Sequence, residues 1–295
     1  MSMAAEAPAY MQSGLQSEAE LGSMLDLQLQ LTWPMELPML RAIVPEKGLV
    51  RVLDVGCGQG RFARKIVEEF SNVAVLGVDL EQPNVDIAQQ SAVASRAAAR
   101  LNFERGNAYD LSSISKVHGL FDIVSCRSML YTLPEVDRVV VSILRTLNPI
   151  GGVAHFFCED YGAVFSAPAR DGVDHARFWA EGPCKMFPAP HMGRQIHTIA
   201  ARAARALGLR AELRVTQLPI STQLGGAVGR ETLAQIFESW RDYAPLVAQK
   251  TVITVEEHLE TLNDIAAACR DPDGYVLWLC TVCDVHLLGP LDAEQ

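Results

Sequence analysis

Three glycines spaced two residues apart, Gly56, Gly58 and Gly60, follow directly on an apolar run that begins at Val50. Glycine lets the backbone turn sharply and approach a ligand without a Cβ in the way. Residues 61–70 have helical periodicity, and the start of a helix offers free N–H groups and the positive end of its dipole. A strand, a glycine turn and a helix in this order indicate a nucleotide site in an α/β protein.

Two acidic residues near this turn narrow the choice of ligand. Asp54 stands two positions before the first glycine, where a carboxylate would repel a phosphate but would suit an ammonium group. Asp79 ends the apolar run 73–79 and could accept hydrogen bonds from both hydroxyls of a ribose. Dinucleotide-dependent enzymes place an acid at the same point, so Asp79 alone does not separate the two kinds of ligand.

Polar side chains after the apolar run 153–158 are candidates for catalysis. Because open α/β sheets bind ligands beyond the carboxyl ends of their strands, we expect Glu159, Asp160 and Tyr161 near a substrate. Glu159 or Asp160 could equally cap the turn that follows. These two carboxylates therefore stand as catalytic candidates beside that alternative.

Histidines offer a further candidate for a general base. His191 lies between two prolines and a glycine, in a segment expected to face the site, and is our first choice. The alternative is a loop histidine bonded to the backbone. His155 sits within the apolar run 153–158 and is predicted to be a core residue instead.

Aromatic residues are frequent around the expected pocket. Such rings suit an apolar or aromatic substrate and attract a cation to their faces. Each of them could also be an ordinary core residue. The rings predicted to contact the substrate are Tyr10, Trp33, Tyr161, Phe178 and Trp179.

The elements that must position these residues alternate along the first half of the chain. Short apolar strands separated by helices predict a parallel sheet with helices on both faces. The segment 160–192 is expected to form loops and a short helix over the site. An N-terminal helix is expected to end near Trp33-Pro34 and Pro38, with a short second helix following to Ile43. The predicted strands are 50–55, 73–79, 101–105, 120–126, 153–158, 211–218 and 275–286, and the predicted helices are 21–31, 61–70, 84–100, 136–147, 194–207, 230–248 and 254–269.

Composition excludes several classes of function. The 295 residues are 49% hydrophobic and carry a net charge of −10, which disfavours nucleic-acid and anionic-membrane surfaces. No apolar run suggests a transmembrane helix, and the N-terminus lacks the pattern of a signal peptide. Seven scattered cysteines, with Cys280 and Cys283 inside an apolar run, fit packed, reduced thiols in a cytoplasmic protein without a metal site.

Together these motifs resemble the class I S-adenosylmethionine-dependent methyltransferases, most closely over residues 45–160. Within that superfamily the chain is most similar to small-molecule enzymes of quinone and secondary-metabolite biosynthesis. The resemblance implies a Rossmann-like, mostly parallel seven-stranded sheet with helices on both faces, an antiparallel last strand and a helical insertion as lid. It also implies an N-terminal helical cap, 1–44, before a methyltransferase domain, 45–295, whose substrate-side elaboration is 160–270.

The resemblance also assigns the cofactor contacts. The loop 53–60 would wrap the methionine part, Asp79 would take the ribose, and Asn107, where the family often has Asp, would accept a bond from the adenine amino group. The segments 121–127 and 147–152 match two further motifs that a dehydrogenase has no reason to carry. The implied cofactor residues are Asp54, Gly56, Cys57, Gly58, Gly60, Asp79, Leu80, Asn107, Ala108, Cys126, Arg127 and Tyr131.

The activity that the resemblance implies is methyl transfer from S-adenosyl-L-methionine to oxygen, nitrogen or carbon of a small apolar or aromatic molecule, with S-adenosyl-L-homocysteine as product. A homodimer is compatible with it. Three alternatives stay open at this point: an NAD-dependent oxidoreductase, a non-methylating reaction such as a cyclisation on the same fold, and a non-catalytic partner subunit. The intact glycine loop together with Asp79 argues against the last.

Overall fold

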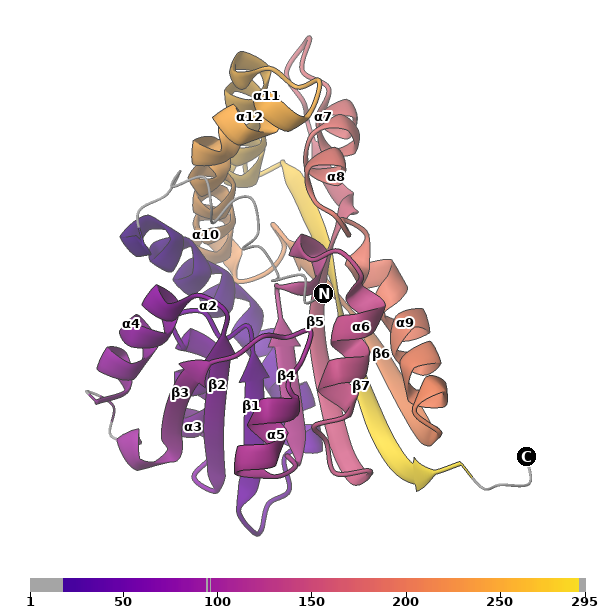
Figure 1. Cartoon of the computed structure of the whole chain (residues 1–295). Coiled ribbons are helices and arrows are strands. Elements are labelled where there is room, and N and C mark those ends of the chain that lie inside the picture. Colours follow the sequence, from indigo (N-terminus) through magenta and orange to yellow (C-terminus); the bar gives the residue numbers. More distant parts are fainter. Residues whose placement is uncertain (1–17, 94, 96, 292–295) are drawn as a thin grey trace.

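The computed structural model describes residues 18–93, 95 and 97–291, and its centre is a seven-stranded sheet (Figure 1). The strand order is β3-β2-β1-β4-β5-β7-β6. β7 runs antiparallel to β5 and β6, and all other neighbours pair in parallel, so the predicted sheet with its antiparallel last strand is confirmed. The strands are β1 (Val50–Val55), β2 (Val73–Asp79), β3 (Leu101–Arg105), β4 (Ile123–Arg127), β5 (Ile150–Ala167), β6 (Leu209–Ser221) and β7 (Tyr275–Pro290).

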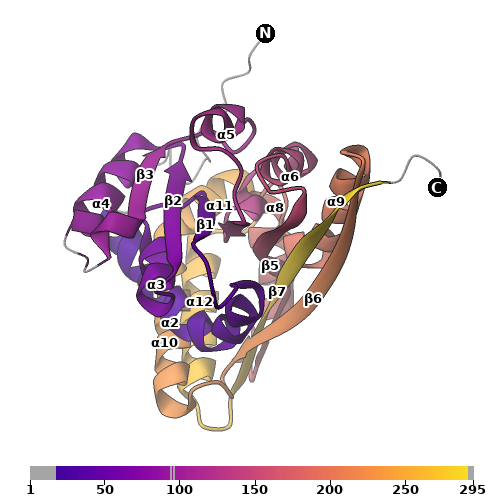
Figure 2. The same cartoon turned by 90° about the horizontal axis from the view of Figure 1, so that it is seen from below.

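Helices cover both faces of this sheet (Figure 2). α5, α6 and α9 lie on one face, and α2, α3, α10 and α12 lie on the other. The α-helices are α2 (Glu18–Ile43), α3 (Arg61–Glu69), α4 (Gln82–Val93), α5 (Ser112–His118), α6 (Val136–Leu144), α7 (His175–Glu181), α8 (Pro183–Met186), α9 (Met192–Ala206), α10 (Gly226–Ser239), α11 (Ala244–Lys250) and α12 (Val255–Arg270). Three 3₁₀ turns are η1 (Ala98–Arg100), η2 (Leu130–Thr132) and η3 (Trp240–Tyr243).

The alternation of side chains along the strands decides which residues face α2. In β1, Leu53 and Val55 are buried in the cluster under α6 and α9, whereas Val50 and Val52 are buried under α2 and α3. Successive strand residues point to opposite faces, so Asp54 shares the α2 face with Val52. The sheet therefore sends a polar side chain toward α2 among apolar neighbours.

Helix α2 is longer than its sequence predicts. The expectation that Trp33-Pro34 and Pro38 would end it is wrong, since one helix runs from residue 18 to residue 43 with both prolines inside. An internal proline removes a backbone hydrogen bond and costs about 3 kcal/mol. Tertiary contacts offset that cost here, because Trp33, Glu36 and Leu40 of this helix are all buried.

Strand β5 is also longer than predicted. It does not end at residue 158 but continues to Ala167, because β7 pairs with it along its whole length, with an irregularity between Glu159 and Val164. The segment 160–192, predicted to form loops and a short helix, thus begins as strand, and the two short helices α7 and α8 follow it. Glu159 is consequently the last paired residue before that irregularity, and Tyr161 lies within it.

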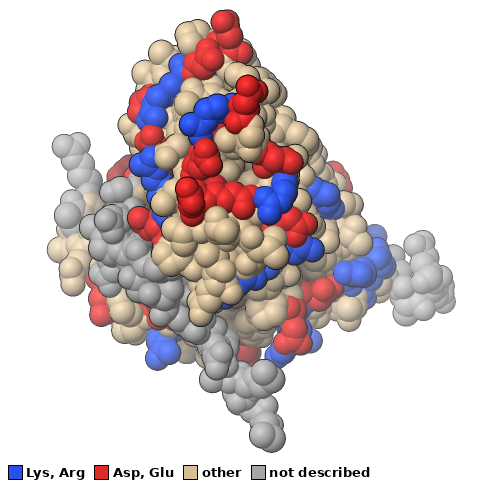
Figure 3. Space-filling model, turned by 90° about the horizontal axis from the view of Figure 1, so that it is seen from above, with Lys and Arg blue, Asp and Glu red and all other residues tan. Residues whose placement is uncertain are grey.

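The end of the molecule that carries α7, α10 and α12 has a charged exterior. Acidic and basic side chains lie interspersed on the face seen from above (Figure 3). Several of them pair between helices: Arg270 of α12 bonds to Glu231 and Glu238 of α10, and Arg177 of α7 bonds to Glu257 of α12. These pairs connect the helices that stand beyond the sheet.

Candidate active site

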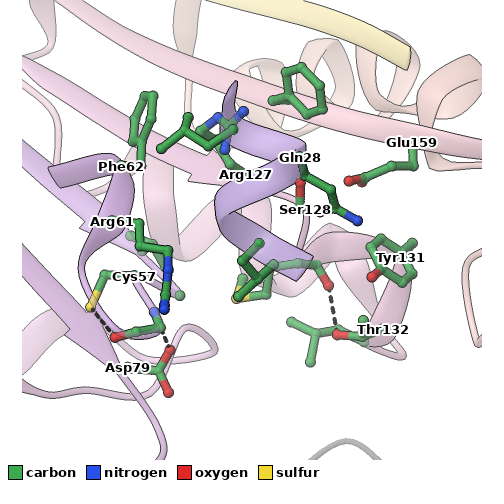
Figure 4. Close-up of a pocket in the computed structure, with 18 of the residues that line it drawn as sticks. Gln28, Cys57, Arg61, Phe62, Asp79, Arg127, Ser128, Tyr131, Thr132 and Glu159 are labelled. Carbon is green, nitrogen blue, oxygen red and sulfur yellow. Dashed lines mark hydrogen bonds between the residues drawn. The ribbon is translucent and has the colours of Figure 1, made fainter. Parts of the chain in front are cut away.

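A pocket lies at the carboxyl ends of β1, β2 and β4 and beside the middle of β5, beneath the first half of α2 (Figure 4). The ends of β1, β2 and β4 contribute Asp54, Asp79 and Arg127 to its wall, β5 contributes Glu159, and α2 contributes side chains between Met24 and Thr32. Open α/β sheets bind their ligands at this edge. One end of the pocket is polar, around the glycine loop, and the other end is apolar, around β5 and β7.

The glycine loop is shaped by backbone that favours glycine. Gly56 and Gly58 both have positive φ angles, 71° and 52°. The N–H groups of Gly56 and Cys57 donate to the carbonyl of Val78 at 2.8 and 3.0 Å, which ties the loop to the end of β2. A Cβ on Gly56 would overlap the side chain of Met129, so a larger residue does not fit there.

Asp79 is fixed by the loop that it faces. Its Oδ2 accepts a hydrogen bond from the Gly58 N–H at 2.9 Å, and its Oδ1 accepts one from the Glu81 N–H at 3.0 Å and one from Asn84 at 3.3 Å. A carboxylate has about four acceptor positions, so one remains beyond these three, and the bond from Asn84 is long. The carboxylate is therefore oriented and still able to accept from a ligand.

The adenine-side residues predicted from the sequence also line the pocket. Leu80, Asn107 and Ala108 form part of its wall next to Asp79. The Asn107 Oδ1 accepts a hydrogen bond from the Tyr109 N–H at 3.0 Å, so one lone pair of that oxygen has a local partner. Its second lone pair is available for an amino group.

Asp54 has an unusual environment for a carboxylate. It is 3% exposed and lines the pocket, and its Oδ2 has no hydrogen-bond partner among the described residues. Burial raises the pKa of Asp54 to about 7, against the lowering effect of Arg127, and the nearby Asp79 and Glu36 raise it further. An unpaired buried carboxylate is costly unless a ligand supplies a donor or a positive charge.

Arg127 is occupied by protein contacts rather than open to a ligand. Its guanidinium forms a two-pronged pair with Glu36 of α2, at 2.8 and 2.7 Å. It also lies between the rings of Phe62 and Phe157, at 4.6 and 4.5 Å from their centroids. Arg127 thus lines the pocket and, at the same time, attaches α2 to the end of β4.

A buried ion cluster continues from Glu36 into the sheet. His155 is fully buried, and its Nδ1 and Nε2 donate to the carboxylates of Asp284 at 2.6 Å and Glu36 at 3.0 Å. Burial lowers the pKa of His155, but its bonds to Asp284 and Glu36 outweigh that effect and hold the pKa at about 9. His155 is a core residue, as predicted, but its two carboxylate partners are far away in the sequence, so the charged cluster could not be predicted.

The apolar end of the pocket surrounds one carboxyl group. Glu159 is 2% exposed, and its Oε2 has no partner among the described residues. Burial raises the pKa of Glu159 to about 7, although a hydrogen bond with Ser128 acts in the other direction. Around it, the pocket wall is formed by Phe157, Tyr161, Phe187, Trp240 and Trp278, and the Tyr161 ring lies 5.4 Å from that of Trp240.

The comparisons with known proteins agree with this geometry. Residues 52–151 match the family model of a methyltransferase domain. The chain contains a class I S-adenosylmethionine-dependent methyltransferase domain. The predicted family is confirmed, and the alternative of an NAD-dependent oxidoreductase is not favoured.

Curated relatives resemble this methyltransferase domain over part of their length. A trans-aconitate 2-methyltransferase of Deinococcus radiodurans is 30% identical over 118 residues, which cover 39% of this chain and 40% of that protein. A ubiquinone biosynthesis O-methyltransferase of Coxiella burnetii is 27% identical over 123 residues, or 42% and 49% of the two chains. The match therefore spans less than half the length of either relative.

Solved structures share the fold of this chain. Phosphoethanolamine N-methyltransferase 2 of Haemonchus contortus, solved with phosphomonomethylethanolamine and S-adenosylhomocysteine, covers 98% of this chain and 61% of its own, with a TM-score of 0.55 at 16% identity. The [4+2]-cyclase SpnF covers 83% of this chain and 77% of its own, with a TM-score of 0.50 at 19% identity. At these identities the likeness concerns the fold alone.

Two of the predicted catalytic residues lie away from the pocket of the methyltransferase domain. Asp160 alternates with Glu159 on β5, so its side chain faces the other way, and it pairs with Arg194 of α9 at 2.5 and 2.7 Å. His191 lies 3.3 Å from Asp160 and is absent from the pocket wall. The structure therefore brings Glu159 to the pocket and leaves Asp160 and His191 on the α9 side.

Several predicted binding residues also lie outside the pocket wall. Phe178 and Trp179 are 0% and 3% exposed and belong to the core beneath α10 and α12, where Trp179 lies 6.5 Å from Tyr161. Trp33 packs on Phe62 in the core under α2. Gly60 and Cys126 do not line the pocket either, whereas Tyr131 and Tyr161 do. Tyr10 lies outside the described residues.

No group of three His, Cys, Asp or Glu side chains within 18–93, 95 and 97–291 could hold a metal ion. Within the same ranges, no helix combines the length and the apolarity that a membrane span requires.

Proposed function

We propose that this chain transfers the methyl group of S-adenosylmethionine to a small apolar or aromatic molecule. The observation that carries the proposal is the buried Asp54 carboxyl, which lines the pocket beside the glycine loop with one oxygen unpartnered. The amino group of the cofactor's methionine part is a donor of the required charge. A phosphate or pyrophosphate ligand would be repelled there.

The remaining polar groups fit the rest of the cofactor. Asp79 would accept from the ribose hydroxyls, and Leu80, Asn107 and Ala108 would border the adenine. The glycine loop brings backbone close to the methionine part without side chains in the way. When bound, the cofactor supplies an electrophilic methyl group. The protein's own residues then have to orient the acceptor and exclude water.

The second ligand would occupy the apolar end of the pocket. Phe157, Tyr161, Trp240 and Trp278 line this region, and α2 covers it through Met24 and Leu25. We propose that α2 and the helices between β6 and β7 act together as the lid of the site. Closure over the acceptor would remove water from the reacting atoms.

The thiols fit a reducing compartment such as the cytoplasm. All seven cysteines are free, six of them are buried, and Cys184 on α8 is half-buried. Protein thiols persist unpaired in such compartments. A homodimer stays a prediction, which the mass of the purified protein in solution would test.

Calorimetry tests the cofactor assignment. The wild-type protein should bind S-adenosylhomocysteine and not NADH. Asp79→Ala should weaken S-adenosylhomocysteine binding at least about tenfold, because charge-assisted hydrogen bonds contribute about 1.5–3 kcal/mol each. Asp86→Ala is the matched control, since it removes an exposed carboxylate from the adjacent helix α4. Equal affinity in Asp79→Ala and wild type would remove the ribose assignment.

Transfer of radiolabel tests the reaction itself. A non-methylating reaction on the same fold would bind the cofactor equally well but would leave its labelled methyl group in place. A non-catalytic subunit would do the same. Appearance of labelled product from a small acceptor, dependent on Asp79, supports the proposal.

A further inference from the structure

The acceptor end of the pocket holds one buried carboxyl group beside the polar residues Gln28 and Ser128, and the rest of its wall is mainly apolar and aromatic. We propose that the acceptor is an apolar molecule that carries no negative charge, that its reacting atom is the oxygen of a hydroxyl or the nitrogen of an amine, and that Glu159 accepts the proton of that atom. This inference rests on the proposed function and specifies the class of substrate.

The position of Glu159 is the first support. It stands on β5 with Phe157 and Tyr161 to either side on the same face, and all three line the pocket. Its carboxyl group points into the pocket, toward Gln28 and Ser128 (Figure 4). One carboxyl oxygen has no partner among the described residues, and the residue is only 2% exposed to solvent. A bound O–H or N–H group would satisfy that oxygen.

The rings around Glu159 are the second support. Tyr161 lies 4.8 Å from Phe187, 5.4 Å from Trp240 and 6.0 Å from Trp278, measured between ring centroids. These four rings line one end of the pocket together with Ile220 and Ile236. Such a wall gains free energy by covering apolar surface, and ring faces attract a neutral or cationic group. The indole N–H groups of Trp240 and Trp278 have no partner among the described residues and can donate to a polar atom of the ligand, but the rings carry no positive charge to balance an anion.

The charges in the pocket wall are the third support. Of the described lining residues, only Arg61 and Arg127 are basic, and both have carboxylate partners. Arg61 bonds to Asp26 at 2.6 Å, and Arg127 forms a bidentate pair with Glu36. The acidic lining residues are Asp54, Asp79, Glu81 and Glu159. A carboxylate or phosphate on the acceptor would therefore be buried without a counter-charge, which is strongly unfavourable.

The proposed reaction is a direct displacement at the methyl carbon. A lone pair on the acceptor's oxygen or nitrogen forms a bond to the methyl carbon while the bond from that carbon to sulfur breaks. The electron pair of the broken bond goes to sulfur, which becomes the neutral thioether of S-adenosylhomocysteine. The acceptor's proton passes to the Glu159 carboxylate and from there to water, and no oxidant or metal takes part.

Binding of matched probes tests the charge preference. The protein is loaded with S-adenosylhomocysteine, and the quenching of tryptophan fluorescence is followed on addition of 2-naphthol, 2-naphthylmethylamine or 2-naphthoate, which share one ring system. The naphthol and the amine should bind at least about tenfold more tightly than the naphthoate. Burying the naphthoate charge without a partner should cost more free energy than the tenfold difference in affinity requires. Glu159→Gln should narrow this gap, because it removes the carboxyl group that repels the naphthoate.

Asp160→Asn is the matched control. It neutralises the next residue on the same strand, which faces away from the pocket and pairs with Arg194, so the preference among the three probes should stay as in wild type. Binding of naphthoate as tight as that of naphthol would overturn the proposal, as would an unchanged preference in Glu159→Gln. S-adenosylhomocysteine binding is measured first in every variant. If the wild-type protein does not bind S-adenosylhomocysteine, the proposed function itself is contradicted.

Turnover separates the two kinds of reacting atom. With cofactor labelled in its methyl group, label on the naphthol assigns an oxygen acceptor and label on the amine assigns a nitrogen acceptor. Either result supports the proposal if Glu159→Gln lowers kcat more than it changes KM. Labelling of trans-aconitate, the acceptor in the name of the Deinococcus relative, would contradict it, because that molecule carries three carboxylates.

Discussion

At the scale of single residues, Asp54 gives the site a pH dependence that can be measured. The pKa of its carboxyl is about 7 in the free protein, above the ordinary value of 3.8, because the group is buried and unpaired. A bound ammonium group would lower that pKa, so binding would release a proton. Affinity for S-adenosylhomocysteine should therefore rise about tenfold between about pH 6 and about pH 8 and level off above that range.

Calorimetry in two buffers of different ionisation enthalpy would measure this release of protons. Asp54→Asn should bind the ligand more weakly and with little dependence on pH. Glu159→Gln is the control, since it alters the other carboxyl with a pKa of about 7 but leaves Asp54 in place. A full pH dependence in Asp54→Asn would assign the proton to another group.

The sequence predicts individual contacts at the cofactor end better than at the acceptor end. Asp54 and Asp79 stand at the ends of β1 and β2, and Asn107 follows β3, so their positions at the sheet edge could be predicted, and all three line the pocket. Glu159 and Asp160 are adjacent, and only the alternation of β5 and its pairing with β7 decide which of them faces α2. A single sequence does not give that parity.

At the scale of elements, α2 depends on a buried ion cluster. Glu36 is fully buried and pairs with both Arg127 and His155. Burial raises the pKa of Glu36, but the charge of Arg127 and the bonds to His155 and Arg127 lower it to about 2. Glu36→Gln should cost about 3–5 kcal/mol in the free energy of unfolding, because it leaves buried charges without their partner.

Urea unfolding would measure this cost, and the same helix provides a control. Glu69 pairs with Arg41 of α2 at the surface, so Glu69→Gln should cost less than about 1 kcal/mol. The pKa of His155, about 9 against an ordinary 6.5, adds a second measurement. Its contribution to stability is complete below about pH 6.5 and is lost as the pH rises through about 9. The loss of stability between these pH values should be smaller in Glu36→Gln than in the wild type. Equal dependence of stability on pH in the two proteins would contradict the pairing of His155 with Glu36.

The same helix shows why local signals are insufficient for element boundaries. Pro34 and Pro38 predict a break, and only contacts from distant β4 and β5 explain why the helix continues. Those partners, Arg127 and His155, stand about a hundred residues further along the chain, beyond the reach of propensity. The strands of the first half could be predicted because each is a short apolar run bounded by turn residues.

At the scale of the whole molecule, one sheet supports three core clusters. One cluster fills the α6 and α9 face, and the other two lie beneath α2 to α4 and beneath α10 to α12. Because β5 and β7 are shared between clusters, we expect a single unfolding transition that a ligand shifts as a unit. S-adenosylhomocysteine at about 100 times its Kd should add about 2.7 kcal/mol to the free energy of unfolding.

Calorimetric scans with and without S-adenosylhomocysteine would measure this shift. At the same ligand concentration, the free energy of unfolding of Asp79→Ala should increase less than that of the wild type. A second transition for α10 to α12, unaffected by the ligand, would show that these helices do not share the cooperativity of the sheet.

The cysteines described above have a practical consequence. Burial raises the pKa of every one of the seven thiols, and the six buried ones should resist air oxidation and alkylation because reagents do not reach them. Only Cys184 is half-buried, and it lies two residues before Met186 in the wall that receives the acceptor. A maleimide dye should therefore attach at Cys184 without mutagenesis. Its fluorescence would then report binding and dissociation of the acceptor in real time.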